Sequence, residues 1–316
     1  MEVVAARLRA GGTLANELPA RDATDAELLR AHTPAYLELV KRECANEGAR
    51  YLSTGDVVVD GRSLAVARRA AGGAIAAVEA AVSANEGVFA LIRPPGHHAE
   101  TDRGMGFCLF NNAAIAARAY RAMGGGPVLV VDFDYHHGNG TEACAGDGLS
   151  YVSTHAFPAY PGTGRRSYAS GGDLVANVPL PVCGLSTEAF VAAWEALLPR
   201  IAGVLRPELL VVSAGFDYVA GDPVGDLGVE IEAARWLAGA IAATAREFCG
   251  GRVAYVLEGG YDLDALTASI AAVARVHDRG EGERSGAELA AAPMPLRGTL
   301  NELFGSLPGT PKAPAN

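Results

Sequence analysis

Short apolar runs alternate with longer amphipathic stretches along most of this chain. The apolar runs are rich in β-branched residues and predict buried strands over residues 88–92, 128–131, 149–154, 209–213 and 253–257. The stretches between them repeat apolar residues at helical spacing and predict helices over residues 63–84, 111–123, 187–205, 230–248 and 263–276. This alternation predicts a single α/β domain, with a mostly parallel β-sheet and helices on both of its faces.

Polar segments that contain glycine follow several of the predicted strands. They are residues 93–98, 132–140, 213–217 and 258–261. In open parallel sheets, ligands bind outside the carboxyl ends of the strands, so these segments are expected to meet at one shared site. Any one of them alone could be an ordinary turn between a strand and a helix.

The segment after the second predicted strand indicates a cation site. Asp132, Asp134 and His136 are spaced by two, and on an extended strand they would share one face. Two carboxylates and an imidazole at a buried strand end are costly unless a cation binds there. Oxygen and nitrogen ligands without a thiolate suit zinc, iron or manganese. The alternative is a capping aspartate followed by surface histidines.

Three other segments could add reactive groups. Asp217 ends a predicted strand and could be a second carboxylate ligand, or simply a helix N-cap. His97 and His98 could both reach a cleft from an irregular backbone, although such a pair is more often at the surface. Tyr261 follows two glycines and could point its hydroxyl inward or pack as an aromatic lid.

Together these groups suit metal-assisted amide hydrolysis. A zinc ion held by Asp134, His136 and Asp217 would keep one position open for water and substrate. The ion would lower the pKa of the water and polarise a carbonyl. A neutral histidine could accept the proton, and a tyrosine hydroxyl could donate to the oxyanion, so no covalent intermediate is needed.

These motifs, in this order, resemble the histone deacetylase and acetylpolyamine amidohydrolase family, which has the arginase-deacetylase fold. The resemblance extends from about residue 28 to residue 276 and rests on residues 93–98, Gly106-Phe107-Cys108, 132–140, 160–164, 213–217 with Asp222-Pro223, and 258–261. The spellings RPPGHH, HHGNGT and EGGY are similar to the class II branch and its bacterial relatives. The resemblance implies zinc-dependent removal of acetyl or other acyl groups from acetyl-lysine, acetylated polyamines or small acylamides.

The resemblance also implies roles for individual residues. One zinc ion would be bound by Asp134, His136 and Asp217. The catalytic group would comprise His98 as general base, Asn139 that orients it, His97 paired with Asp132 as stabiliser or acid, and Tyr261 on the carbonyl oxygen. A carboxylate raises the pKa of an imidazole more than a neutral amide does, so His97 is expected to be more basic than His98.

Further positions are implied for the substrate and for a second ion. Phe107 and Tyr160 match the aromatic walls of an acyl-lysine tunnel, beside Gly106, and Val224 matches an apolar rim position. A K⁺ or Na⁺ ion beside the zinc would use Asp132, Asp134, His136 and Ser153. The catalytic domain is expected over residues 1–278, without the opening strand and rim loop of the family, and a linker and tail over residues 279–316.

Composition narrows the class of protein. Lys and Arg number 26 against 36 Asp and Glu, a net charge of −10 that argues against direct nucleic-acid binding. The five cysteines form no CxxC pair, which indicates neither a disulfide framework nor a thiolate zinc site and suits the cytoplasm. No signal-like start or membrane-length apolar run is present, so no membrane partner is expected. An oligomer stays possible.

Two rival functions fit parts of the sequence. An arginase-like ureohydrolase with two manganese ions would share the fold, but it needs more carboxylates and an Asp-x-His-x-Asp order where this chain has Asp-x-Asp-x-His. A non-catalytic binder of acyl-lysine or polyamine would not need the complete set of catalytic groups. Metal stoichiometry tests the first rival, and an acetyl-lysine assay with and without chelator tests the second.

Overall fold

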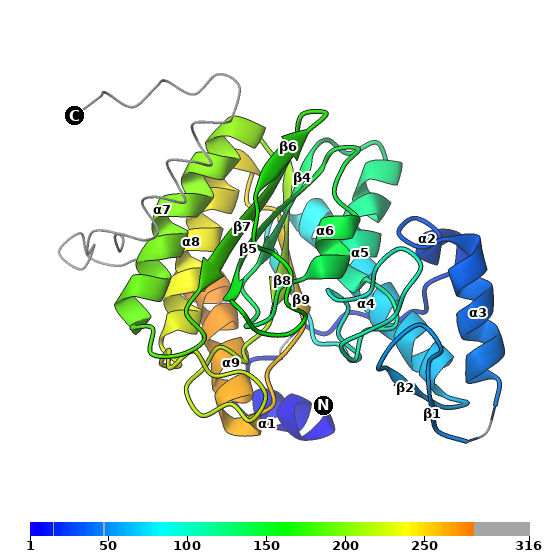
Figure 1. Cartoon of the computed structure of the whole chain (residues 1–316). Helices are drawn as coiled ribbons and strands as arrows, with labels where there is room; N and C mark the ends of the chain where they lie inside the picture. The colour runs from blue at the N-terminus through cyan, green and yellow to red at the C-terminus, as the bar shows by residue number, and fades with distance from the viewer. Residues whose placement is uncertain (15, 47, 281–316) are drawn as a thin grey trace.

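The molecule is built around a central seven-stranded sheet, and a computed structural model describes residues 1–14, 16–46 and 48–280 (Figure 1). In spatial order the strands are β3 (Gly87–Ala90), β9 (Val253–Leu257), β8 (Leu209–Ala214), β4 (Val128–Asp132), β5 (Leu149–Ala156), β7 (Asp173–Leu180) and β6 (Tyr168–Ser170). Every neighbouring pair is parallel except β6 and β7, which are antiparallel. The predicted fold class is confirmed.

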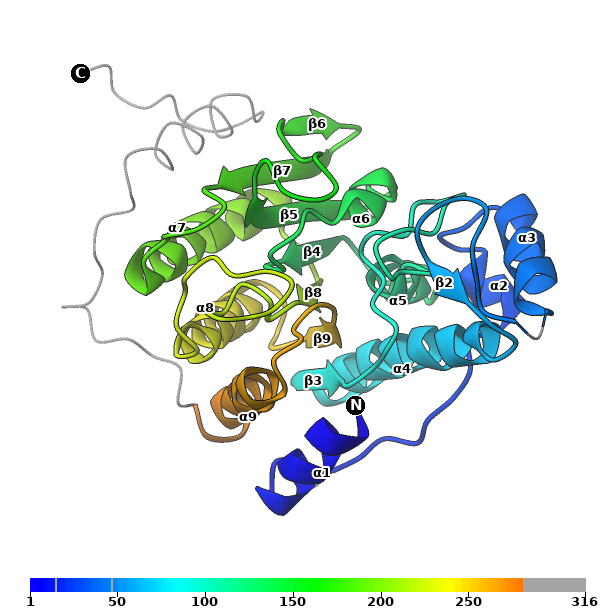
Figure 2. The same ribbon diagram turned by 60° about the horizontal axis from the view of Figure 1, so that its bottom comes forward.

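Helices cover both faces of the sheet (Figures 1 and 2). One face is packed by α7 (Thr187–Leu205), α8 (Ala233–Phe248), α9 (Leu263–Arg279) and α1 (Glu2–Ala10). The other is packed by α4 (Ser63–Ala84) and α5 (Asn112–Ala122), with α2 (Asp25–Leu28) and α3 (Pro34–Cys44) completing that core. Residues of β4 alternate between the two cores, so the strand is buried on both sides and its sequence is a continuous apolar run.

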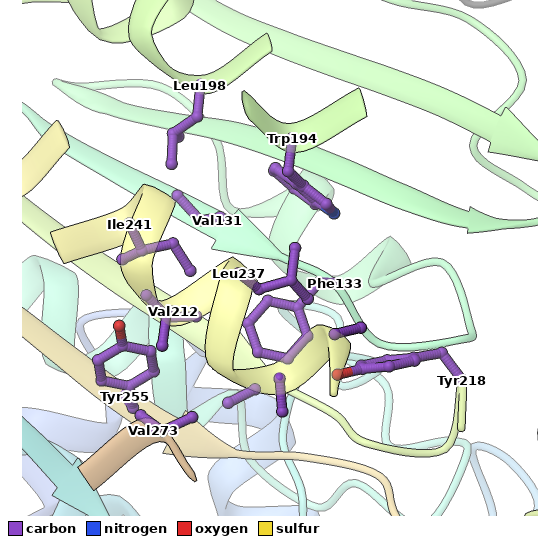
Figure 3. Close-up of a cluster of buried hydrophobic side chains, with 14 of the residues drawn as sticks. Val131, Phe133, Trp194, Leu198, Val212, Tyr218, Leu237, Ile241, Tyr255 and Val273 are labelled. Atoms are coloured by element: carbon purple, nitrogen blue, oxygen red, sulfur yellow. The ribbon is translucent and has the colours of Figure 1, made fainter. Parts of the chain in front are cut away.

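The hydrophobic core between the sheet and helices α7, α8 and α9 holds β4 and β8 in place. Figure 3 shows Trp194 of α7 and Leu237 of α8 in one cluster with Val131 of β4 and Val212 of β8. All four side chains are buried. Because such cores are close-packed, the loops that follow β4 and β8 start from rigid positions.

The N-terminal part contains elements that were not predicted. Besides α1 to α3, a short hairpin pairs β1 (Arg50–Tyr51) with β2 (Val58–Val59).

Strand β7 was also missed by the sequence prediction, because Asn177 and Pro179 interrupt its apolar pattern. A short helix, α6 (Asn139–Ala143), lies between β4 and β5 in the chain.

One prediction about β4 is wrong. The strand ends at Asp132, so Asp134 and His136 lie in the following loop and do not share a strand face with it. Side-chain oxygens turn the chain out of the sheet: Asp132 Oδ1 accepts the N–H of Asp134 at 3.2 Å, and Asp134 Oδ1 accepts the N–H of His136 at 2.8 Å. Local bonds of this kind compete with the hydrogen bonds of the sheet.

The described part of the chain ends just after α9. Gly280 caps this helix with φ of 70°, a conformation that glycine adopts easily. The predicted linker and tail lie outside the described residues from residue 281 onward. Among the described helices, none has the length and apolar character to cross a bilayer.

Candidate active site

A cavity of about 300 Å³ opens beyond the carboxyl ends of β3, β4, β8 and β9. Segments far apart in sequence therefore meet there, as expected at such an edge. Its lining residues are Asp56, Pro95, His97, His98, Gly106, Phe107, Asp134, His136, Tyr160, Asp217, Val224, Gly259 and Tyr261.

Two carboxylates and an imidazole form the base of this cavity. The possible ligand atoms of Asp134, His136 and Asp217 all lie within 4.8 Å of one another. His136 Nδ1 is 3.2 Å from Asp134 Oδ1 and 3.0 Å from Asp217 Oδ2. The two aspartates are 1% and 0% exposed, so this much negative charge is deeply buried.

Backbone N–H groups bind one oxygen of each aspartate from outside the group. Asp217 Oδ1 accepts the N–H of Tyr135 at 3.0 Å, and Asp134 Oδ2 accepts the N–H of Gly259 at 2.8 Å. Asp217 Oδ2 is buried, and its ion-pair partner is the imidazole of His136, at 3.0 Å. Two buried carboxylates that share one imidazole are costly, and a divalent cation with three protein ligands and an open position would neutralise them.

Without a cation, protons balance the charge. Burial and the charge of Asp134 raise the pKa of Asp217. Burial would lower the pKa of His136, but hydrogen bonds to Asp134 and Asp217 outweigh it and raise this pKa to about 10. A protonated His136 thus stands where a metal would bind, and a metal would have to displace that proton.

His98 is held with one nitrogen free. Its Nδ1 is 2.9 Å from Asn139 Oδ1, and Asn139 Nδ2 donates to Glu100 Oε1 at 2.7 Å. A carboxylate only accepts, so this bond fixes the amide and requires His98 to carry its proton on Nδ1. Burial, together with the positive charge of His97, lowers the pKa of His98 well below its usual value. Nε2 of His98 is therefore available as a proton acceptor.

His97 has the opposite charge preference. Its Nδ1 is 3.1 Å from Asp132 Oδ2, which also accepts the hydroxyl of Tyr151 at 2.9 Å. Burial would lower the pKa of His97, but the carboxylates of Asp134 and Asp132 raise it to about 10. The rings of His97 and His98 lie only 4.1 Å apart. The prediction that His97 is the more basic of the pair is confirmed.

A buried glutamate holds the backbone of the histidine loop. Glu258 Oε2 accepts the N–H of Gly96 at 2.6 Å and that of His97 at 3.1 Å, while Oε1 accepts the hydroxyl of Ser213 at 3.1 Å. The side chain is fully buried, and burial raises its pKa to about 7. The sequence assigned Glu258 no role, because these partners become neighbours only in the folded sheet.

Close approach to the carboxylates requires glycine at two positions. A Cβ atom at Gly259 would collide with the carboxylate oxygens of Asp217 and Asp134, and one at Gly138 would collide with Asp132 Oδ2. The glycines of both motifs therefore serve the site directly.

Tyr261 lines the same cavity as the two histidines. Its backbone N–H donates to Asp222 Oδ2 at 2.7 Å, and the guanidinium of Arg93 lies 5.1 Å from its ring centroid. Burial, followed by the charges of Asp134 and Asp217, raises the pKa of Tyr261. The phenol therefore stays protonated at neutral pH and can donate a hydrogen bond.

Comparison with known proteins decides the family. A family model described as histone deacetylase domain matches residues 1–277. This chain belongs to the histone deacetylase family. The prediction made from the motifs is confirmed.

Relatives in this family come from distant organisms. The chain is 35% identical to histone deacetylase 15 of Arabidopsis thaliana, over 87% of this chain and 51% of that protein. It is 36% identical to a probable deacetylase of Methanothermobacter thermautotrophicus, over 89% of this chain and 82% of that protein. The crystal structure of the HDA15 HD domain has a TM-score of 0.85 and 32% identity, covering 98% of this chain and 87% of that one.

These names include deacetylases from a plant and an archaeon, which supports the prediction of an enzyme that acts as a hydrolase. The chain spans about half the length of the Arabidopsis protein.

The remaining predicted positions are those for substrate contact and those for a monovalent cation. Phe107, Tyr160 and Val224 lie at the cavity mouth and are 57%, 41% and 42% exposed. Ser153 is buried in β5, in register with Asp132 of β4, and its hydroxyl is 2.8 Å from His155 Nδ1. Its role in holding a monovalent cation stays a prediction.

Some site residues had no signal in the sequence. Asp56 lies on the tip of the β1–β2 hairpin and reaches the cavity across a long separation in sequence. Glu100 is close to His98 in sequence, but only its contact with Asn139 shows its purpose. Asp222 was quoted as part of a motif without a role, and it anchors the backbone of Tyr261.

Proposed function

We propose that this chain is a zinc-dependent deacetylase that hydrolyses the acyl-amide bond of acetyl-lysine, acetylated polyamines or small acylamides. The observation that carries the proposal is the buried group of Asp134, His136 and Asp217, in which two carboxylates share one imidazole, beside a proton-accepting His98. Membership of the histone deacetylase family supports the same reaction.

The residues of the chain would divide the reaction among them. A bound zinc ion would supply an acidified water and polarise the acyl carbonyl. His98 Nε2 would accept the proton of the attacking water, because Asn139 keeps the other nitrogen protonated. His97 would carry positive charge next to the developing negative charge. The hydroxyl of Tyr261 would donate to the carbonyl oxygen as it becomes an oxyanion.

Removal of one ligand tests the metal assignment. Asp217→Ala deletes a carboxylate whose other oxygen binds the N–H of Tyr135. We expect it to lose most bound zinc and at least 100-fold in turnover of a fluorogenic acetyl-lysine peptide, on the order of the loss typical for a removed catalytic group. Zinc content is measured by elemental analysis of the dialysed protein. Full zinc and full activity in this variant would show that the ligand assignment is wrong.

The rivals are separated by two further measurements. The carboxylate of Asp132 is hydrogen-bonded to His97 and Tyr151. It is therefore already occupied, which supports one divalent cation at the site over a pair. We therefore expect about one divalent ion per chain, whereas an arginase-like ureohydrolase would hold two. Activity that a chelator abolishes and zinc restores distinguishes the enzyme from a non-catalytic binder, which would bind acetyl-lysine without turnover. The same titration with iron and manganese identifies the preferred metal.

Three further assignments belong to this proposal. A K⁺ or Na⁺ ion beside the zinc would be held through Asp132, Asp134, His136 and Ser153, at the ends of two neighbouring strands. The five cysteines are free, which supports a reducing compartment such as the cytoplasm. The acidic balance supports small acylated amines or acylated proteins as partners over nucleic acid.

A further inference from the structure

The tip of the β1–β2 hairpin lies directly against the loop that carries Phe107. The backbone carbonyl of Thr54 accepts a hydrogen bond from Arg103 Nε at 3.1 Å. The hydroxyl of Thr54 accepts one from the N–H of Gly104 at 3.2 Å. Gly55 is so close to the carbonyl of Gly104 that a Cβ atom there would collide with it. The hairpin therefore braces this loop by two hydrogen bonds and by the close approach of the two backbones.

Asp56 is the point where this brace meets both walls of the cavity. Its Oδ1 accepts the N–H of Gly106 at 2.8 Å, and its Oδ2 accepts the hydroxyl of Tyr160 at 3.1 Å. Gly106 precedes Phe107, and both Phe107 and Tyr160 line walls of the cavity. One carboxylate thus connects two loops that are otherwise separate in sequence.

The loop of Phe107 needs such support. Phe107 has φ of 66°, which is unfavourable for an aromatic residue, and Gly106 before it has φ of 56°. Backbone hydrogen bonds between Met105 and Cys108 close this turn at 3.2 and 2.9 Å. The bond from Gly106 to Asp56 ties the turn to the rest of the protein, so the direction of the Phe107 side chain depends on it.

The wall formed by Tyr160 is placed by the same tie. The ring of Tyr160 lies edge-on to His98, with centroids 5.2 Å apart at 90°. Without its hydroxyl bond to Asp56, this ring could rotate away from the general-base side of the cavity while its loop stayed folded.

We propose that Asp56 is a positioning residue that sets the width of the channel by tying the Phe107 wall to the Tyr160 wall. The inference rests on the proposed deacetylase function, because it assigns the tied walls to gripping the aliphatic chain between acyl group and amine. A fixed channel of this kind selects substrates with an unbranched methylene chain. Its effect is on binding, since Asp56 touches no reacting group.

Four variants of the full zinc-loaded chain separate the tie from other roles of Asp56. Asp56→Ala removes both bonds, and Tyr160→Phe removes only the hydroxyl bond and keeps the ring. Asp56→Asn is the matched control, because its oxygen can still accept from Gly106 and its amide can donate to the hydroxyl of Tyr160. The fourth variant combines Asp56→Ala with Tyr160→Phe and measures whether the two changes act through one interaction.

Two substrates show where the effect arises. One is a fluorogenic acetyl-lysine peptide, and the other is N-butylacetamide, which has the acylated chain of lysine without any peptide backbone. We expect Asp56→Ala to raise KM about 3- to 10-fold for both substrates, the range of one or two net hydrogen bonds, with kcat within about twofold of the parent. Asp56→Asn should stay close to the parent, and the double variant should be no worse than Asp56→Ala.

Each contrary result overturns the inference. An effect seen with the peptide and absent with N-butylacetamide would mean that Asp56 contacts the substrate backbone. An Asn variant as impaired as the Ala variant would mean that its charge, not its hydrogen bonds, matters. Unchanged KM in Asp56→Ala with both substrates would remove any role.

Binding of octanoyl hydroxamic acid keeps the test independent of turnover. Its affinity for zinc-loaded parent and variants is measured by calorimetry, and the tie predicts the same loss of about 3- to 10-fold in Asp56→Ala. If the parent hydrolyses neither substrate, the proposed function fails while this measurement still decides the inference. Equal affinity of the parent and Asp56→Ala would overturn it.

Discussion

Two adjacent histidines at the base of the cavity differ because their partners differ. His97 faces the carboxylate of Asp132, whereas His98 faces the neutral amide of Asn139, which Glu100 keeps in one orientation. These surroundings raise the pKa of His97 and lower that of His98, so one imidazole favours its protonated form and the other its neutral form. The single-residue spacing in the sequence hides this division, since it depends on partners 35 and 41 residues away.

This difference predicts the pH dependence of kcat/KM. His98 must be uncharged and its pKa is lowered, so the acidic limb should lie below pH 6.5. His97 must be charged, and its pKa is raised to about 10 by Asp134 and Asp132. Zinc on Asp134 would weaken that effect, so the basic limb should lie below pH 10. Asp132→Asn removes one carboxylate and should move the basic limb to lower pH by about one unit.

The pH profile has a matched control. Tyr151→Phe removes the other hydrogen bond to Asp132 and leaves the carboxylate in place, so its basic limb should stay where the parent has it. A basic limb that does not move in Asp132→Asn would mean that a group other than His97 controls it.

The hydroxyl of Tyr261 gives the next residue-scale prediction. Its raised pKa keeps it protonated, and donors to an oxyanion are worth about 3 kcal/mol, or roughly 100-fold in kcat. We expect Tyr261→Phe to lose about this factor and to keep its zinc, because the proposed ligands are Asp134, His136 and Asp217. His98→Ala should lose at least as much. Steady-state rates with zinc determination on each sample check this, and a Tyr261→Phe enzyme as fast as the parent would assign the oxyanion to another donor.

At the scale of elements, Glu258 joins three parts of the sheet edge. It follows β9, bonds Ser213 at the end of β8, and accepts the N–H groups of Gly96 and His97 in the loop beyond β3. Glu258→Ala would leave these three groups buried and unpaired, at about 1–3 kcal/mol each, so the free energy of unfolding should fall by at least about 3 kcal/mol. Glu258→Gln keeps an acceptor for them and should fold normally.

The stability of the two variants is compared by urea unfolding at equal zinc loading.

The stability of the parent should also depend on pH through Glu258. Because burial raises the pKa of Glu258 to about 7, the folded state holds a proton that the unfolded state releases at lower pH. The parent therefore loses stability from this group as pH rises from the unfolded pKa of about 4.5 towards 7, and Glu258→Gln does not. An Ala variant as stable as the Gln variant would show that the hydrogen bonds contribute little.

The elements that sequence predicted best are those buried on both faces. Strands β4, β8 and β9 are continuous apolar runs because helices cover each side, and that pattern is readable without a structure. Strand β7 carries Asn177, whose side chain is needed by His137, so its pattern is broken by a tertiary contact. The β1–β2 hairpin is too short and too exposed to leave any period, although it brings Asp56 to the cavity.

In the candidate site, too, the sequence predicted the residues whose type alone is informative and missed those whose role depends on a tertiary contact. The sequence predicted the carboxylates and imidazoles that the fold brings together, because carboxylates and histidines at strand ends are informative residue types in themselves. The residues that position them could not be predicted, because Glu100, Asp56 and Glu258 are ordinary acids until the fold supplies the N–H or amide group that each one meets.

At the scale of the whole molecule, metal binding and folding should be coupled. Asp134 and His136 follow β4 and Asp217 follows β8, so the ligand group exists only when the sheet is assembled. A ligand that binds only the folded state stabilises it by about 4 kcal/mol at a free concentration 1,000 times its Kd. We therefore expect zinc to raise Tm by several degrees, and to release about one proton per ion at pH 7, because the pKa of His136 is raised to about 10 without metal.

Calorimetry in buffers of different ionisation enthalpy measures the proton, and thermal scans with and without zinc measure the stabilisation. Asp217→Ala should abolish the zinc-dependent rise in Tm. Asp56→Asn is the control, because Asp56 lines the same cavity outside the ligand group and its substitution should leave the rise unchanged. Zinc affinity should also increase with pH up to about 10, as the competing proton leaves His136. Binding that releases no proton, or a rise in Tm that survives in Asp217→Ala, would mean that the ion is held elsewhere in the chain.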